Sequence, residues 1–441
     1  MKKTKNKEAA ALIILLAALL LGCLAALLLR PRKTEPISRS AFLLNTFISI
    51  TLYDTEDTRI LDRCVELCQE YENRFSKTIE GSELYRLNHR NPGETTFSIS
   101  DDLAAMIGEG LEYSRITGGA YDLTVEPLSS LWNFTDGSHV IPSEAEIEEA
   151  VSRVGWENIR LEGNELTFLT PDTTLDLGSI AKGYIADRLK DYLLSEGVRS
   201  ANINLGGNVL CVGGLPDKEP FHIGLQMPFA SYSSIFANLD ITDLSVVTSG
   251  VYERHFEVDG VNYHHLLNPK TGYPYDNGLI AVTIVSPRSV DGDVLSTACF
   301  SLGLEEGLAL VNSLDGIYGY FVTEDYELYY SRGAEQFVNE ASLQIHEDDA
   351  IRTGGESTGA AGETSGTDSE TTDAGREGTD TTAGSRADAA GEATDTAGNQ
   401  ADTAAGNQAG AAGEATDTAG SADMTAANNQ ADAAGHRQEA P

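Results

Sequence analysis

The chain has 441 residues, a formal net charge of −38 at pH 7 and a sequence pI of about 4.4. Because nothing in this acidic composition supplies a basic face, we expect no nucleic acid partner. The length allows one or two folded domains.

The amino-terminal segment is basic and then apolar. Lysines within the first seven residues precede an uncharged run at 9–29, which is long enough to span a bilayer. Within this run, Leu20-Leu21-Gly22-Cys23 resembles a bacterial lipoprotein cleavage box. Two fates stay open: a lipidated Cys23 after cleavage, or an uncleaved anchor. Both predict that 1–37 is a signal or membrane anchor with a linker, that the chain is attached to the cell membrane, and that the following domain lies outside the cytoplasm.

The first half of the region 38–346 predicts a strand followed by several helices. Alternating residues at 46–53 indicate a strand, and 56–75 has the apolar periodicity of an amphipathic helix. Cys64 and Cys68 lie on that helical face, and one turn of helix is poor geometry for a disulfide, so we interpret them as small buried side chains. Ser100 caps a helix that ends at Gly118, and 144–154 is a short acidic helix.

The second half alternates irregularly between strands and helices. A helix at 179–196 is closed by Gly197, and 293–314 is helical, either continuous or in two pieces around Gly303. Strands are predicted at 201–212, 221–226, 235–241, 279–285 and 317–323. Because there is no regular βαβ alternation, the fold class is predicted to be α+β, with mixed, largely antiparallel sheets and packed helices.

The last segment, 347–441, has the composition of a disordered acidic tail. It contains no Phe, Trp or Tyr, carries 19 acidic and 4 basic residues, and repeats GEATDTAG at 391–398 and 413–420. Such a segment buries too little apolar surface to offset the entropy of ordering.

The run at 175–184 combines a carboxylate, a glycine turn and a lysine. We expect a strand that ends in Asp176, a turn at Gly178 and a helix that opens at Ser179, with Lys182 in its first turn. The N–H groups at a helix start and the lysine charge favour an anion such as a phosphate. An ordinary helix cap is the alternative.

Three further groups of residues suggest chemistry. Asp293 and Thr297 are spaced to share one face at a helix start, which suits Mg²⁺, although a helix-terminal acid and a packed threonine explain the same spacing. His264 and His265 are candidate proton acceptors or structural residues. The run at 118–122 suits a flavin or purine, or is a helix C-cap.

In this order, the motifs resemble the ApbE family of FAD:protein FMN transferases, over about 41–330. The matching runs are Leu44-Asn45-Thr46, Phe75-Ser76, Ser82-Glu83, Leu87-Asn88, the segment 119–125, the segment 176–183, Asn204-Leu205-Gly206-Gly207, Thr248-Ser249-Gly250, the segment 265–269 and the segment 293–297. Three positions depart from the common pattern. Asn45 stands where glycine is usual, and Leu44 where methionine is frequent. Ser179 also replaces a glycine, alanine or threonine, which changes little if the metal contact is a backbone carbonyl.

The resemblance implies a Mg²⁺-dependent transfer of FMN from FAD to a threonine or serine of a target protein, with release of AMP. It implies metal ligands at Ser179, Asp293 and Thr297, and proton transfer by His265 or Asp293. The implied flavin contacts are Leu44, Ala120, Tyr121, Asp122, Asp176, Lys182 and Leu266. The implied acceptor is an exported flavin-acceptor protein of an electron-transfer system. An FAD pyrophosphatase that yields FMN and AMP, and a non-catalytic flavin-binding surface protein, are the alternatives.

Overall fold

The computed structural model describes residues 34–135, 137–231, 234–341 and 344–347. The predicted membrane segment at 9–29 and the tail from residue 348 onward therefore lie outside the described residues. Within the described part, no helix is both long and apolar enough to cross a membrane.

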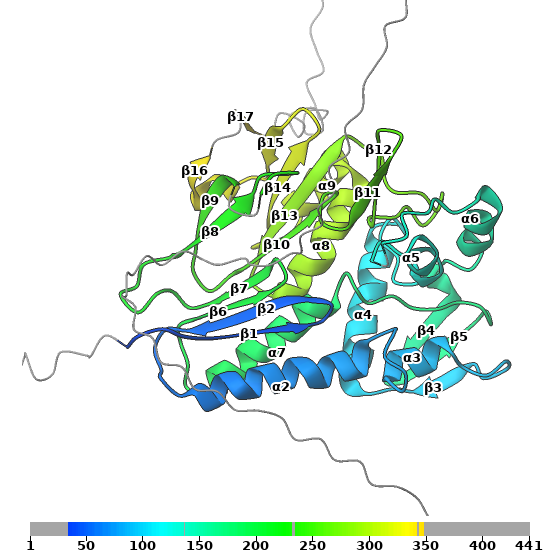
Figure 1. The fold of residues 1–441 in the computed structure, drawn as a ribbon, viewed down its shortest axis with the longest axis horizontal. Helices are drawn as coiled ribbons and strands as arrows, with labels where there is room; N and C mark the ends of the chain where they lie inside the picture. The colour runs from blue at the N-terminus through cyan, green and yellow to red at the C-terminus, as the bar shows by residue number, and fades with distance from the viewer. Residues whose placement is uncertain (1–33, 136, 232–233, 342–343, 348–441) are drawn as a thin grey trace, which may run out of the picture. The chain divides into compact units, whose positions relative to one another are not determined.

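A nine-stranded sheet forms the centre of the described structure (Figure 1). Its neighbours are antiparallel except for the last pair, β15 and β17, which is parallel. In spatial order the strands are β1 (Ile37–Leu43), β2 (Thr46–Leu52), β6 (Ala201–Leu205), β7 (Asn208–Val212), β10 (Ser245–Gly250), β13 (Leu279–Ser286), β14 (Tyr318–Thr323), β15 (Glu327–Tyr330) and β17 (Gln344–Glu347). The predicted α+β class with largely antiparallel sheet is confirmed.

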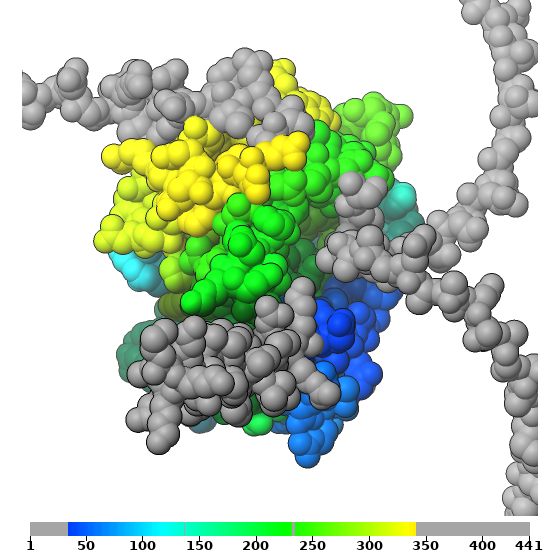
Figure 2. Space-filling view, turned by 90° about the vertical axis from the view of Figure 1, so that its left-hand side faces the viewer, coloured from blue at the N-terminus to red at the C-terminus, as the bar shows by residue number. Residues whose placement is uncertain are grey.

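Helices cover one face of this sheet, and a smaller sheet covers part of the other. Strand β13 contacts both layers. Val282 and Ile284 on one face pack with helical residues such as Leu295, and Ala281 and Val285 on the other face pack with residues of the smaller sheet. That sheet has the order β16-β9-β8, and its β16–β9 pairing brings the late chain (yellow) beside the green segment in Figure 2. Strand β13 is thus buried on both faces.

The remaining elements complete the two layers and a lateral region around α4. The helices are α2 (Thr58–Phe75), α3 (Glu83–Asn88), α4 (Asp101–Ile116), α5 (Glu126–Trp132), α6 (Glu144–Val151), α7 (Ala181–Ser195), α8 (Ser289–Leu302) and α9 (Leu304–Asn312), with 3-10 turns η1 (Trp156–Asn158) and η2 (Ala334–Phe337). The other strands are β3 (Thr96–Ser98), β4 (Ile159–Glu162), β5 (Glu165–Phe168), β8 (Phe221–Gln226), β9 (Ile235–Ile241), β11 (His255–Val258), β12 (Val261–His264) and β16 (Val338–Ala341).

Most predicted elements are confirmed with small shifts at their ends. Helix α2 buries Ile60, Leu61, Cys64, Cys68 and Phe75 as its periodicity indicates, and both cysteines are free thiols. Burial raises the pKa of each of these thiols to about 12, as expected for inert core side chains. Gly303 does separate two helices, α8 and α9.

Four local predictions were wrong. The predicted strand 201–212 is a hairpin, β6–β7, that turns at Gly206 and Gly207. The segment that ends in Asp176 is not a strand, and helix α7 starts at Ala181, so Ser179 lies in the preceding turn and is not the helix cap. Helix α8 starts at Ser289, which places Asp293 in its second turn rather than at its start.

Two chain reversals and the end of a third strand lie at one end of the sheet. Ile48 pairs with Leu205, Leu205 pairs with Asn208, and Asn208 pairs with Val247, so the β1–β2 turn, the β6–β7 turn and the end of β10 are neighbours. Gly206 has a positive φ of +65°, and a Cβ there would lie 2.8 Å from the Cβ of Thr46. Only glycine therefore lets the two turns approach this closely.

Candidate active site

The centre of the candidate site is Asp293, which projects from the second turn of α8. It is 3% exposed, and its Oδ1 accepts a hydrogen bond from Nζ of Lys182 at 3.1 Å. Its Oδ2 accepts a hydrogen bond from the backbone N–H of Gly183 at 2.9 Å. The anion that the start of α7 binds in this structure is thus the chain's own carboxylate, which ties α7 to α8.

Thr297 lies one turn further along α8, on the same face as Asp293. Its Oγ1 lies 3.2 Å from Oγ of Ser249, at the end of β10. Oγ of Ser249 also lies 2.8 Å from Oγ of Ser296, and Ser249 is only 8% exposed. A carboxylate and several hydroxyl groups therefore share one side of α8, facing the end of β10.

Ser179 and Tyr121 bring the turn before α7 to the segment after α4. The Ser179 hydroxyl donates to the Tyr121 phenol oxygen at 3.1 Å. Burial, together with the nearby carboxylates of Asp293, Asp176 and Asp122, raises the pKa of Tyr121, so the phenol is protonated at neutral pH. The predicted metal and flavin residues on these two segments are therefore neighbours.

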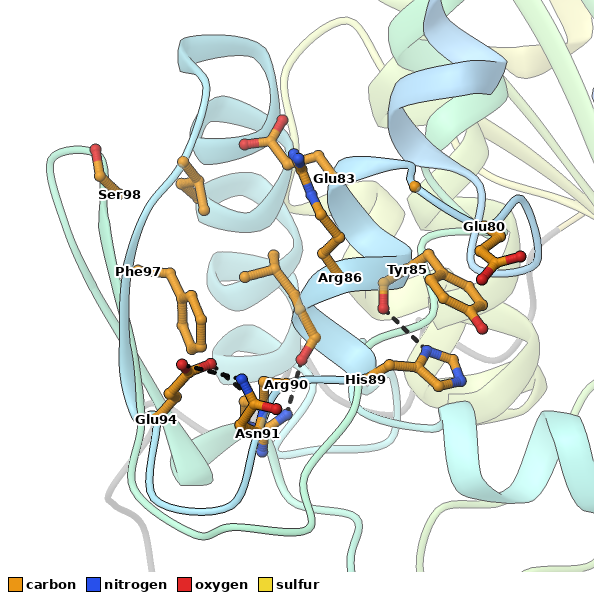
Figure 3. A pocket seen from close by; sticks show the side chains of 13 residues that line it. Glu80, Glu83, Tyr85, Arg86, His89, Arg90, Asn91, Glu94, Phe97 and Ser98 are labelled. Carbon is orange, nitrogen blue, oxygen red and sulfur yellow. Dashed lines mark hydrogen bonds between the residues drawn. The ribbon is translucent and has the colours of Figure 1, made fainter. Parts of the chain in front are cut away.

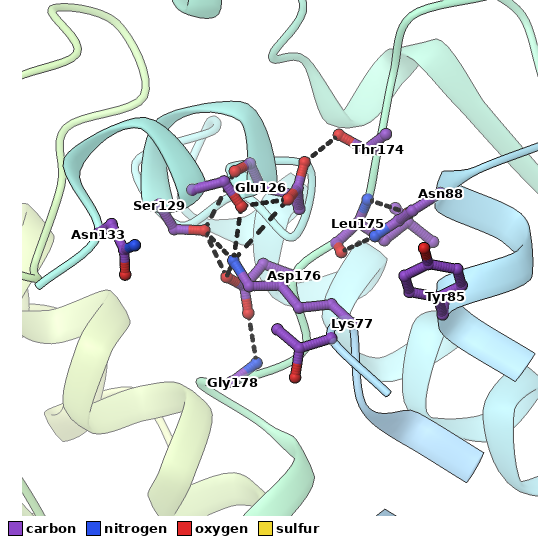
Figure 4. Close-up of polar contacts among 12 residues, drawn as sticks. Lys77, Tyr85, Asn88, Glu126, Ser129, Asn133, Thr174, Leu175, Asp176 and Gly178 are labelled. Atoms are coloured by element: carbon purple, nitrogen blue, oxygen red, sulfur yellow. Dashed lines mark hydrogen bonds and ion pairs between the residues drawn. The ribbon is translucent and has the colours of Figure 1, made fainter. Parts of the chain in front are cut away.

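Asp176 is the centre of a polar network that the sequence did not reveal (Figure 4). Its Oδ2 accepts hydrogen bonds from Lys77 Nζ at 2.9 Å and from Ser129 Oγ at 2.6 Å, and its Oδ1 accepts one from the Gly178 N–H at 2.8 Å. Burial alone would raise the pKa of Asp176, but the Lys77 ammonium and these hydrogen bonds lower it to about 2. Asp176 thus fixes the turn that leads to Ser179.

Side chains from α3 and α5 hold the segment just before Asp176. Asn88 donates to the Leu175 carbonyl at 2.8 Å and accepts from the Leu175 N–H at 2.9 Å. Thr174 donates to Glu126 at 2.6 Å (Figure 4). These contacts hold the extended segment in place without a strand partner.

Asp122 has a structural role in the turn after α4. Its carboxylate accepts hydrogen bonds from the N–H and the hydroxyl of Thr124 and from the N–H of Trp156. Burial raises the pKa of Asp122, and these donors oppose that shift. Asp122 therefore orders the backbone around Ala120 and Tyr121.

Tyr275 connects two of the predicted flavin residues, and sequence reasoning missed it. Its hydroxyl donates to the carbonyl of Ala120 at 3.0 Å, and its N–H donates to the carbonyl of Leu266 at 2.9 Å. Leu44 lies in the β1–β2 turn at φ +56°, where its N–H donates to Glu72 at 2.8 Å. Ala120 and Leu266 are thus joined through Tyr275, whereas Leu44 is held by α2.

His265 follows β12 and has one ring nitrogen without a partner. Its backbone N–H donates to the Arg254 carbonyl, while Nδ1 is buried and has no hydrogen-bond partner among the described residues. Burial, with smaller contributions from Arg254 and His264, lowers the pKa of His265 to about 3. The ring is therefore neutral at physiological pH. His264 differs, because its Nε2 contacts the Tyr275 carbonyl at 3.0 Å, as expected of a structural residue.

A surface pocket lies elsewhere, between α3 and β3 (Figure 3). It has a volume of about 550 Å³, and none of the predicted site residues lines it. Arg90, one of its cations, donates to the carbonyls of Leu87 and Pro171 and lies 3.8 Å over the Phe168 ring. The charge of Arg90 is thus used within the protein, and we do not assign this pocket to the site.

Comparison with known proteins identifies the family of this chain. The model of the ApbE family matches residues 44–321, which is more than half of the chain. A Klebsiella pneumoniae protein named FAD:protein FMN transferase is 37% identical over 66% of this chain and 90% of that protein. A Treponema pallidum protein of the same name is 30% identical over 68% of this chain and 88% of that protein.

Solved structures show the same fold. The ApbE protein of Thermotoga maritima superposes with a TM-score of 0.64 at 30% identity and covers 69% of this chain and 100% of its own. The flavin transferase ApbE of Vibrio cholerae gives a TM-score of 0.63 at 28% identity, over 69% of this chain and 99% of its own. The fold is that of flavin-transferring enzymes, and the chain belongs to the ApbE family.

Proposed function

We propose that this chain transfers FMN from FAD to a threonine or serine hydroxyl of a target protein, with release of AMP and with Mg²⁺ as cofactor. Membership of the ApbE family supports the reaction class. The observation that carries the proposal is the buried Asp293 carboxylate, held by Lys182 and Gly183 on the same helical face as Thr297.

The donor set fits Mg²⁺. Among the described residues, no cluster of three or more His, Cys, Asp or Glu side chains is placed to hold a metal ion, so hydroxyl and phosphate oxygens would have to complete the site. Asp293, Thr297 and Ser179 offer only oxygen atoms, which Mg²⁺ prefers, and they leave positions for water and phosphate oxygens. When bound, Mg²⁺ would offset the negative charge of the FAD pyrophosphate.

The flavin nucleotide would lie along the segments that meet at this centre. We assign its contacts to Leu44, Ala120, Tyr121, Asp122, Asp176, Lys182 and Leu266. Lys182 supplies a positive charge beside Asp293, where the pyrophosphate would lie. Ala120 and Leu266, which Tyr275 joins, would form part of the wall for the rings.

His265 is the residue that would accept the proton of the attacking hydroxyl. A hydroxyl is a weak nucleophile and needs a base within about 3 Å. Asp293 already accepts from Lys182 and Gly183, whereas Nδ1 of His265 has no partner among the described residues. The anionic substrate beside the ring would raise the pKa of His265 from about 3 and so make the imidazole a stronger base.

Intact mass spectrometry tests this proposal. The full chain is incubated with FAD, Mg²⁺ and a flavin-acceptor domain. We expect the acceptor to gain one FMN, and we expect no gain after chelation or with Asp293→Ala. Asp217→Ala changes an exposed acid outside the site and should react like the wild type. Free FMN and AMP without an adduct would identify a pyrophosphatase instead. FAD that stays bound and intact would identify a flavin-binding protein.

We also propose that the chain is attached to the cell membrane, with the catalytic domain outside the cytoplasm, where an exported acceptor of an electron-transfer system would be its partner. The basic and apolar sequence at 1–33 supports this proposal. Membrane fractionation tests it, with Cys23→Ala as the variant. Release of that variant from the membrane would indicate lipidation, retention would indicate a helical anchor, and a wild-type chain in the soluble fraction would refute the attachment.

A further inference from the structure

The hydroxyl groups of Ser249, Ser296 and Thr297 form a continuous chain whose hydrogen-bond directions can be worked out. Ser296 Oγ lies 3.0 Å from the backbone carbonyl of Asp293, which can only accept, so the Ser296 proton points to that carbonyl. At the 2.8 Å contact between Ser296 and Ser249, the Ser249 hydroxyl must therefore be the donor.

This direction leaves Ser249 as an acceptor toward Thr297. A serine hydroxyl has one proton and two lone pairs, and the Ser249 proton is already used. The 3.2 Å contact between Ser249 and Thr297 must then be a hydrogen bond from Thr297 to Ser249. The hydroxyl protons thus run in one order, from Thr297 to Ser249, from Ser249 to Ser296, and from Ser296 to the Asp293 carbonyl.

We propose that Ser249 is a positioning residue that accepts the Thr297 proton and thereby aims the oxygen lone pairs of Thr297 at the divalent cation. A hydroxyl that binds a cation must turn its proton away from the metal, and a buried acceptor fixes that orientation. Ser249 suits this role because it is 8% exposed, which leaves little room for water to replace it. This inference rests on the proposed Mg²⁺ site.

The neighbouring residue Thr248 provides a matched control. Its hydroxyl pairs with that of Thr283 at 2.8 Å, on the adjacent strand β13. Successive residues of a strand point to opposite faces, so Thr248 does not share the hydroxyl chain on α8. Thr248→Val and Ser249→Ala each remove one hydroxyl from the same strand, but only the second change removes the acceptor of the Thr297 proton.

Cation binding itself is the measurement. Free Mn²⁺ is titrated by electron paramagnetic resonance against the full chain with FAD present, for the wild type and each variant. We expect Ser249→Ala to weaken Mn²⁺ binding about tenfold or more, the usual effect of losing a group that orients a ligand. Thr248→Val and Ser249→Thr should bind within about twofold of the wild type, since the second keeps the hydroxyl.

A double-mutant cycle separates orientation from a general loss of packing. If Ser249 acts through Thr297, then Ser249→Ala should have no further effect on Mn²⁺ binding once Thr297→Val is present. Equal affinity of Ser249→Ala and the wild type, or additive losses in the double variant, would overturn the inference. A wild type that binds Mn²⁺ no better than Asp293→Ala would instead refute the metal site, and with it the proposed function.

Discussion

Gly183 of α7 lies directly against the backbone of α8, and replacing it with alanine tests whether this close packing builds the site. A Cβ at Gly183 would lie 2.7 Å from both Ser289 C and Val290 Cα, and closer still to the Ser289 carbonyl oxygen. All three atoms belong to the backbone, so no side chain can rotate away and the two helices would have to separate. The same separation would break the hydrogen bond from the Gly183 N–H to Asp293.

Two opposing effects set the magnitude. Alanine is favoured over glycine within a helix by up to about 1 kcal/mol. Forcing a methyl group into a filled space costs about 1–3 kcal/mol, and rigid backbone neighbours place Gly183 at the upper end of that range. The net loss of unfolding free energy should be about 1–2 kcal/mol. At about 2–4 °C per kcal/mol, the melting temperature should fall by about 2–8 °C.

Gly108 provides the opposite case on another helix. Gly108 lies inside α4, and a Cβ added there would have Leu161 Cδ2 as its nearest neighbour, at the ordinary contact distance of 3.6 Å. Gly108→Ala should therefore raise the melting temperature by about 1–4 °C, because only the helix preference changes. Thermal unfolding of the full chain by calorimetry compares the two variants, and the Mn²⁺ titration follows the site. If Gly183→Ala also raised the melting temperature and left Mn²⁺ binding unchanged, the reasoning about the α7–α8 approach would be refuted.

Three further predictions concern charges and hydrogen bonds around the site. Lys77→Met leaves the half-buried Asp176 carboxylate without its cation, so urea unfolding at pH 7 should show a loss of about 1–3 kcal/mol. In the wild type, Asp176 has a folded pKa of about 2, so its stabilising contribution is complete above about pH 4 and is lost as the pH falls toward 2. In the Lys77→Met variant, the folded pKa of Asp176 rises toward its unfolded value, so the loss of stability between about pH 4 and pH 2 should shrink, and a profile equal to that of the wild type would contradict the network. His265 has a folded pKa of about 3, below its ordinary 6.5, so the unfolded chain binds the extra proton and stability should decrease as the pH falls from about 6.5 toward 3. His265→Gln should flatten that part of the urea-unfolding profile, and a slope equal to that of the wild type would show that His265 is not buried in its neutral form. Tyr275→Phe removes the hydrogen bond to the Ala120 carbonyl and should raise KM for FAD by about three- to tenfold with kcat nearly unchanged; an unaltered KM would show that this contact does not shape the flavin site.

The sequence was sufficient to predict the elements that depend on a local pattern of apolar and polar residues. The apolar face of α2 and the spacing of Asp293 and Thr297 depend only on helical periodicity. In the structure, the apolar residues of α2 share one helical face, and Asp293 and Thr297 share one face of α8. The start of α8 was predicted four residues too late because Asp291-Gly292 has the composition of a turn. In the structure, Gly292 is buried against Val247 and Ser286, where a larger residue would not fit. Packing of the helix on the sheet thus overrides the local preference of the glycine.

The parts that could not be predicted depend on residues distant in the sequence. Lys77 gave no local signal, because a lysine in a polar loop is most often exposed, and only the fold brings it to Asp176. The β6–β7 hairpin was interpreted as one strand because Gly206 and Gly207 fit a bulge within a strand as well as they fit a turn. The need for glycine at position 206 comes from Thr46 on another hairpin. Neither contact leaves a pattern in the neighbouring residues.

The order of strands in the central sheet has a consequence for how the chain folds. Strand β2 pairs with β6, so the whole segment from α2 to α7 must be looped out between two adjacent strands. Pairings this distant in sequence give a high contact order, and the entropy of closing such a loop slows folding. The residues of the candidate site, from Leu44 to Thr297, span that closure. The flavin site should therefore be completed only late in folding, and a nascent chain that has not yet released α8 from the ribosome has neither Asp293 nor a site for FAD.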